Sequence, residues 1–174
     1  MKKFFKKMTL KSQKGITLVE LILYMSILSI LLTILTSIFI SALDVQSESN
    51  AVSSVEQDGN YILARLNYDI HRAERINIPP SNGETASSFQ IVIGGVNYTY
   101  SVDVNNNMVL ANNLGTNNLN NYGTSVSAFS VQRLGNVGGV ENTLKINFML
   151  TSRTKRISGF ETKNFQTNLS LRRQ

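Results

Sequence analysis

The sequence predicts an α+β fold in which a long N-terminal helix packs on a C-terminal antiparallel β-sheet. Three observations lead to it: an uncharged apolar run at residues 21–43, hydrophobic residues at helical spacing from there to Pro79-Pro80, and short alternating segments separated by Gly and Asn beyond the prolines. We therefore divide the chain into a basic segment at 1–15, an apolar helix at 16–43, an amphipathic helix at 44–78 and an antiparallel β domain at 79–174. The last two together are expected to form a globular head.

The apolar run is long enough to cross a membrane. Leu21 to Leu43 are 23 residues without a charge; as a helix they extend about 34 Å and exceed a hydrocarbon core of about 30 Å. Six lysines before the run are expected to hold the N-terminus in the cytoplasm: Lys2, Lys3, Lys6, Lys7, Lys11 and Lys14. Glu20 stands at the start of the run. An unpaired carboxylate carried to the middle of the bilayer costs about 2.5–3.5 kcal/mol. We therefore expect Glu20 to be functional.

Helical periodicity continues beyond the apolar run on a single face. Arg65, Asp69 and Arg72 are predicted on the solvent face of this helix. Pro79-Pro80 disfavour helical geometry at Ile78, where the helix is expected to end. The glycine in the buried stripe costs about 1 kcal/mol relative to Ala. The stripe recurs at steps of three and four: Val52, Val55, Gly59, Ile62, Leu66, Ile70 and Ala73.

The remainder of the chain is predicted to form β-strands. Strands are expected at 89–93, 96–104, 108–110, 126–134, around 144–150 and in a last segment with Phe165, Thr167, Leu169 and Leu171 on one face. Gly94-Gly95 indicates a two-residue hairpin turn. Loops are expected at 111–123 and 135–139, and a turn at 153–159. These connections are too short for crossover helices, so the strands should be antiparallel, and one sheet facing the helix is the simplest two-layer arrangement.

The most specific motif is Gly15-Ile16-Thr17-Leu18-Val19-Glu20, between the lysines and the apolar run. With its basic leader it resembles the precursors of type IV pilins and type II secretion pseudopilins. Those precursors have a glycine at the cut site, a hydrophobic first mature residue and glutamate as the fifth. That first residue is most often Phe, and Ile16 departs from it. A secretory signal peptide has a shorter apolar region, about 7–15 residues, and a simple signal anchor leaves Glu20 without a role.

The resemblance implies a structural subunit and not an enzyme. A prepilin peptidase would cut after Gly15, removing the leader 1–15, and methylate the new amine of Ile16. Residues 16–43 would then be a transmembrane and assembly helix. Glu20 would pair with an Ile16 amine of the same chain or of a neighbouring subunit, and the sequence leaves both open. The implied partners are the peptidase, other pilin or pseudopilin subunits, an inner-membrane assembly platform and the lipid bilayer.

The implied location is the cytoplasmic membrane, crossed once with the N-terminus inside and the β domain outside, and afterwards a pilus or pseudopilus. The segments 64–76 and 165–172 look like parts of the J-type minor pseudopilins and related minor pilins, which cap a fibre tip. By their pattern of apolar and polar residues alone, the first segment is an amphipathic helical turn and the second is an alternating strand. The alternative function is a single-pass anchored binding protein whose β domain does not polymerise.

The net charge of +6 belongs to the leader. Its six lysines are among 17 basic residues, so 11 remain beside 11 acidic ones, and nucleic-acid binding is not predicted. Eight basic residues from Arg133 onward form either a solvated face or a surface opposed to an acidic part of the helix. The acidic residues in question are Asp44, Glu48, Glu56 and Asp58. The chain has no cysteine, so burial alone must hold the fold.

No catalytic residue, cofactor or metal site is predicted. His71, the single histidine, sits on a charged helix face without metal-ligating neighbours. Asp103, Asn105 and Asn107 have alternate oxygen spacing, which an Asn-rich turn explains better than a metal site. The region 151–163 offers Glu161 as its one carboxylate among cations, a set that does not suit calcium.

Overall fold

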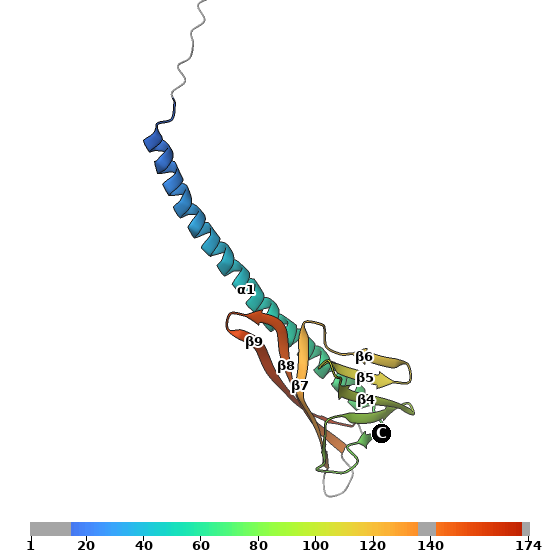
Figure 1. Ribbon diagram of the computed structural model, residues 1–174. Helices are drawn as coiled ribbons and strands as arrows, with labels where there is room; N and C mark the ends of the chain where they lie inside the picture. The colour runs from blue at the N-terminus through green and yellow to red at the C-terminus, as the bar shows by residue number, and fades with distance from the viewer. Residues whose placement is uncertain (1–14, 136–141, 172–174) are drawn as a thin grey trace, which may run out of the picture. The chain divides into compact units, whose positions relative to one another are not determined.

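The computed structural model describes residues 15–135 and 142–171. The lysines of the leader and most of the loop predicted at 135–139 lie outside these ranges. The chain divides into two compact units, Met1–Ala42 and Leu43–Gln174, and helix α1 (Leu18–Arg72) contributes to both. Figure 1 shows α1 followed by β-strands. All the strand pairs are antiparallel, which confirms the α+β class.

Helix α1 has an apolar first part and an amphipathic second part. Its residues 21–42, in the first unit, are all exposed. Within the second unit the helix buries one face, made of Ala51, Val55, Gly59, Ile62, Leu66, Asp69 and Ile70. This matches most of the predicted stripe, but Val52 is 37% exposed and Ala51 takes its place. A step of four from Ala51 to Val55 keeps that face in line with Gly59.

The helix ends earlier than predicted, at Arg72 instead of Ile78. The amide of Ala73 bonds the carbonyl of Ile70, and the amide of Glu74 then donates to Val92 O at 2.8 Å. The following residues form strand β1 (Arg75–Ile78), in which Ile76 is buried. The two prolines favour extended geometry at residue 78, and the alternating sequence Arg-Ile-Asn-Ile extends it backward as a strand.

Five strands form the first sheet, in the order β1-β3-β4-β5-β6. These strands are β3 (Phe89–Ile93), β4 (Val96–Val102), β5 (Met108–Asn112) and β6 (Gly115–Asn118), beside β1. The predicted hairpin is confirmed, since Ile93 pairs with Val96 and both turn glycines have positive φ, +57° and +75°. The loop predicted at 111–123 is wrong in part, because β6 lies inside it; its four exposed polar residues carry no hydrophobic alternation.

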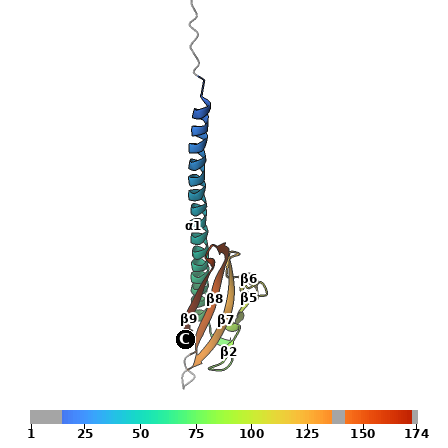
Figure 2. The ribbon, with the colours of Figure 1, turned by 60° about the vertical axis from the view of Figure 1, so that its left-hand side comes forward.

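The second sheet has four strands in the order β2-β7-β8-β9. They are β2 (Thr85–Ala86), β7 (Thr124–Gly135), β8 (Asn142–Arg156) and β9 (Gly159–Ser170). In Figure 2 the long strands β7, β8 and β9 run side by side. The expectation of a single sheet is therefore wrong. After β6 the chain turns away, and β7 pairs with β8 and with the short β2. The turn predicted at 153–159 is confined to its last residues, since β8 continues to Arg156.

One hydrophobic core lies among the amphipathic part of α1 and the two sheets. The predicted alternation on β8 is confirmed, because Leu144, Ile146, Phe148 and Leu150 are all buried. The helix contributes Ile62, Leu66 and Ile70, and the first sheet contributes Phe89, Ile91, Tyr100, Met108 and Leu110. Phe165 of β9 stacks on Phe148 at 5.3 Å between centroids. A Cβ added at Gly59 would lie 2.1 Å from its ring, so this glycine admits the ring to the helix surface.

The prediction that Asp69 lies on the solvent face is wrong, because Asp69 is fully buried. Its Oδ2 accepts hydrogen bonds from the hydroxyl of Tyr100 and, at 2.7 Å, from Nε of Arg65. Burial raises the pKa of the Tyr100 phenol, and the hydrogen bond to Asp69 and its negative charge raise it further. Helical spacing placed Asp69 with Arg65 on the solvent face. In the structure the buried face of the helix is wide enough to include Asp69.

Two ion pairs join β8 and β9 to the acidic residues of the helix. Arg156 pairs with Glu48 and, at 2.8 Å, with Glu161, and Lys163 pairs with Glu56. Of the two interpretations of the C-terminal basic residues, the one in which they oppose an acidic helix therefore holds for Arg156 and Lys163.

Candidate functional site

The N-terminal end of α1 is organised by Thr17. Gly15, Ile16 and Thr17 precede the helix, and Leu18 is its first residue. The Thr17 side-chain oxygen accepts a hydrogen bond from the amide of Glu20 at 3.2 Å, and its carbonyl accepts from the amide of Leu21 at 3.1 Å. Thr17 is thus the N-cap, with Glu20 three residues later as in a capping box. This Thr-x-x-Glu pattern was present in the sequence and could have located the helix start.

Glu20 lies in the first turn of α1, where the positive end of the helix dipole favours a negative charge. Its Oε1 accepts a hydrogen bond from the hydroxyl of Tyr24 at 2.9 Å. Sequence reasoning missed Tyr24, although its position four residues after Glu20 places the two side chains on one helix face. The carboxylate therefore has a partner on its own helix at the start of the apolar run.

Ile16 stands outside the helix, so the helical i,i+4 geometry considered for an Ile16–Glu20 pair is absent from this structure. The chain described here is uncut, and the nitrogen of Ile16 is an amide with Gly15 before it. A Cβ built on Gly15 meets no atom of the described residues within 4 Å. Both residues are exposed and lie outside regular secondary structure.

Besides Tyr24, the apolar part of α1 carries six serine and threonine side chains, and all six bond to the backbone of the helix itself. Each donates to the carbonyl four residues earlier, at 2.8–3.0 Å: Ser26, Ser29, Thr33, Thr36, Ser37 and Ser41. By length and composition this part of α1 can cross a membrane, with a mean hydropathy of 2.4 over 18 residues.

Residues 10–36 match the family described as the prokaryotic N-terminal methylation motif. The match spans Gly15, Ile16 and Glu20 and supports a subunit like the type IV pilins and pseudopilins, which is structural, processed by a prepilin peptidase and assembled with other pilin subunits. With the apolar helix it also supports anchoring in a membrane. No curated protein and no solved structure matches the chain.

The other residues considered in the sequence have structural surroundings. His71 is exposed in the last turn of α1. Asp103 accepts backbone hydrogen bonds from Asn105 and Asn107 at 2.9 and 2.7 Å, which lower the pKa of its carboxyl and identify the Asn-rich turn. Among the described residues no three His, Cys, Asp or Glu side chains gather in a way that could hold a metal ion.

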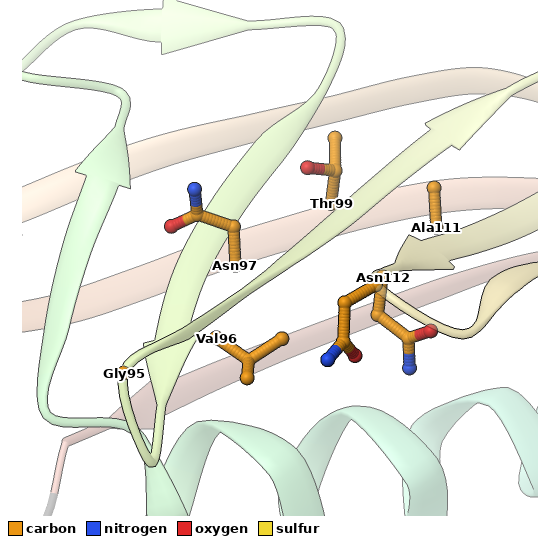
Figure 3. A pocket seen from close by; sticks show the side chains of 7 residues that line it. Gly95, Val96, Asn97, Thr99, Ala111 and Asn112 are labelled. Atoms are coloured by element: carbon orange, nitrogen blue, oxygen red, sulfur yellow. The ribbon is translucent and has the colours of Figure 1, made fainter.

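A hollow lies against strands β4 and β5, with Asn97, Thr99 and Ala111 among its lining residues (Figure 3). Gly95, Val96, Asn112 and Asn113 complete the lining, and all seven residues are uncharged. Amides and the Thr99 hydroxyl can bind a polar group, but none of the lining residues is a base that could activate this hydroxyl as a nucleophile. The described chemistry therefore concentrates at the start of α1.

Proposed function

We propose that the chain is the precursor of a structural fibre subunit, a pilin or pseudopilin, that is inserted in the cytoplasmic membrane. The observation that carries the proposal is the motif match over residues 10–36 with a carboxylate at the head of a membrane-length helix. Processing removes residues 1–15 after Gly15 and methylates the new amine of Ile16. Residues 16–43 serve first as the membrane span and then as the assembly helix.

In the assembled fibre, we propose, Glu20 pairs with the methylated Ile16 amine of a neighbouring subunit. A buried carboxylate and a buried ammonium are each costly alone and tolerable together. Ile16 lies outside α1 in the uncut chain, and Glu20 is bonded to Tyr24. In this proposal assembly exchanges the Tyr24 hydroxyl for the amine of the neighbour, which offers a full positive charge in place of a neutral donor.

A minor, tip-capping role of the J type is a finer part of the proposal. The segments that suggested it, 64–76 and 165–172, lie outside the matched residues 10–36. Their structural roles account for them: the first holds the buried Asp69, and the second places Phe165 in the core. The tip role therefore rests on resemblance alone, and a count of fibres against fibre length in a deletion strain tests it.

Intact-mass measurement of the chain recovered from membranes tests the processing. In cells with a prepilin peptidase the chain should begin at N-methylated Ile16. Gly15→Ala should slow or block the cut. Since a Cβ at Gly15 meets no atom of the described residues within 4 Å, a defect would lie in recognition by the peptidase. Retention of Met1 in the wild-type chain in such cells would refute the proposal in favour of an anchored binding protein.

Glu20→Gln tests the assembly. The amide keeps an acceptor for Tyr24 but removes the charge, so insertion and cleavage should survive. Leaving one partner of a buried charge pair alone costs about 3–5 kcal/mol, so incorporation into sheared fibres should fall by more than about a hundredfold.

Glu74→Gln, at an exposed residue after the helix, is the matched control and should assemble normally. Glu20→Leu should insert at least as well as the wild type, because it removes the polar group. Normal fibre number and incorporation with Glu20→Leu would contradict the pairing.

A further inference from the structure

An exposed apolar patch surrounds the turn between β8 and β9. Ile157 in the turn is 85% exposed, Phe160 at the start of β9 is 52% exposed, and Val45 of α1 is 69% exposed. A groove lined by Asp44, Val45, Glu48, Ile157 and Ser158 joins the turn to the helix. In both ribbon views the turn lies beside α1 (Figures 1 and 2). We call Val45, Ile157 and Phe160 the hairpin patch.

The hairpin patch lies close to the end of the membrane-length run. Val45 follows Leu43, the last residue of the uncharged segment, by two positions, and Glu48 follows it by five. At about 1.5 Å per residue these helix residues stand within about 8 Å of the end of the apolar run. The groove places Ile157 at the same level of the helix. Because α1 is continuous through these residues, a bilayer crossed by the uncharged run would have its outer headgroup region close to Val45.

Two of the carboxylates around the patch are paired. Arg156, next to Ile157, is bound between Glu48 and Glu161. Asp44 also lines the groove and is half-buried. Lys155 is exposed and pairs in register with Phe160 across the hairpin. A cation beside an apolar side chain is the arrangement that binds the boundary between phosphate headgroups and acyl chains.

We propose that the hairpin patch is a second membrane contact, in which Ile157 and Phe160 enter the outer boundary of the bilayer while Lys155 meets phosphate headgroups. The proposal rests on the proposed membrane insertion of α1. It commits to lipid as the occupant because Val45 follows Leu43, the last residue of the uncharged run, by two positions on one continuous helix, and Ile157 lines the same groove as Val45. The contact holds the unassembled subunit head against the membrane, and extraction into a fibre must release it.

The absence of cysteine from the chain makes a direct test possible. Single-cysteine variants Ile157→Cys, Leu114→Cys and Phe39→Cys are labelled with an environment-sensitive fluorophore. The full chain is reconstituted in vesicles of phosphatidylethanolamine and phosphatidylglycerol, and quenching by lipids brominated at two depths is measured. Leu114 is the matched water-facing control, 88% exposed in the β5–β6 turn, and Phe39 reports on the apolar helix.

The label at residue 157 should be quenched at a depth of about 5–10 Å below the surface, that at residue 39 more deeply, and that at residue 114 not at all. Phe160→Ser should reduce the quenching at residue 157. If residue 39 is quenched and residue 157 is not, the hairpin contact is refuted while membrane insertion stands. If residue 39 is not quenched either, membrane insertion fails, and the hairpin contact with it. Protection of residue 157 in sheared fibres but not in vesicles would identify a second subunit as the occupant and refute the lipid contact.

Discussion

At the scale of single residues, Gly59 and Asp69 show how closely the helix and the sheets fit. Phe165 fills the space that a side chain at position 59 would occupy. Asp69 enters the core because Tyr100 and Arg65 both donate to one of its oxygens. Its Oδ1 has no hydrogen-bond partner among the described residues. A buried carboxylate is tolerated only with donors of this kind.

Gly59→Ala should destabilise the head by about 1–3 kcal/mol. Alanine gains about 1 kcal/mol of helix propensity, but its Cβ would overlap the Phe165 ring at 2.1 Å, and overpacking outweighs the gain. Denaturant unfolding in detergent, followed by circular dichroism, measures the change. Gly123→Ala is the matched control, because its Cβ would meet Ser54 at ordinary contact distances of 3.7 and 3.9 Å. A Gly59→Ala variant more stable than the wild type would contradict the packing described here.

At the scale of elements, the second part of α1 is held by its apolar face and not by propensity. Three helix residues, Ile62, Leu66 and Ile70, are fully buried against the sheets. Asp58 adds a polar link, since its Oδ2 accepts from the amide of Asn121 at 2.9 Å and from the hydroxyl of Thr124. These contacts join the helix to the loop between β6 and β7 and to the first residue of β7.

Leu66→Ala should lower the free energy of unfolding by about 2–5 kcal/mol, because it removes three buried carbons and leaves a cavity. Val52→Ala, on the same helix but 37% exposed, should cost much less. Thermal unfolding of the two variants measures the difference: the midpoint of Leu66→Ala should be lower than that of Val52→Ala. Equal midpoints would show that the buried face is misplaced.

Periodicity predicted the elements well where it was strong and poorly where polar residues carried the structure. The alternation on β8 predicted a strand and the glycines at 94–95 predicted a hairpin. The helical stripe was wrong mainly at Val52. The strands β2 and β6 have too few apolar residues to show a period. The division into two sheets could not be predicted from the sequence, because the alternation of apolar and polar residues in a strand is the same whichever strand it pairs with. At the start of α1 the motif predicted Gly15, Ile16 and Glu20, whereas Tyr24 was hidden in an apolar run.

At the scale of the whole molecule, the free energy of unfolding at alkaline pH depends on whether the Tyr100 phenol keeps its proton. The pKa of Tyr100 is raised in the folded protein by burial, then by Asp69. Below about pH 10 tyrosine is protonated in both the folded and unfolded states, and it adds no pH dependence. Above that pH the unfolded chain releases a proton that folded Tyr100 retains. Stability must then fall as the pH rises.

Comparison of the wild type with Tyr100→Phe isolates this effect. Near neutral pH the variant should be less stable by about 1–3 kcal/mol, because Asp69 loses a donor. Above about pH 10 the difference should shrink by up to about 1.4 kcal/mol per pH unit. Tyr61→Phe is the matched control at an exposed tyrosine, since Tyr61 is 54% exposed. A Tyr100→Phe difference that stays constant across this range would mean that the phenol ionises in the folded state.

The six serine and threonine hydroxyls that bond back to α1 allow the apolar helix to move between lipid and protein without unpaired hydroxyl groups. Each hydroxyl has its acceptor on the preceding turn of its own helix. Lipid chains are as apolar as leucine, so moving such a helix between lipid and protein changes its hydrophobic energy little. None of these six serine and threonine hydroxyls has to find a new acceptor on the way, whereas in the proposed pairing the Tyr24 hydroxyl gives up Glu20. When the helix leaves the bilayer, the main polar group that must change its partner is therefore the carboxylate of Glu20.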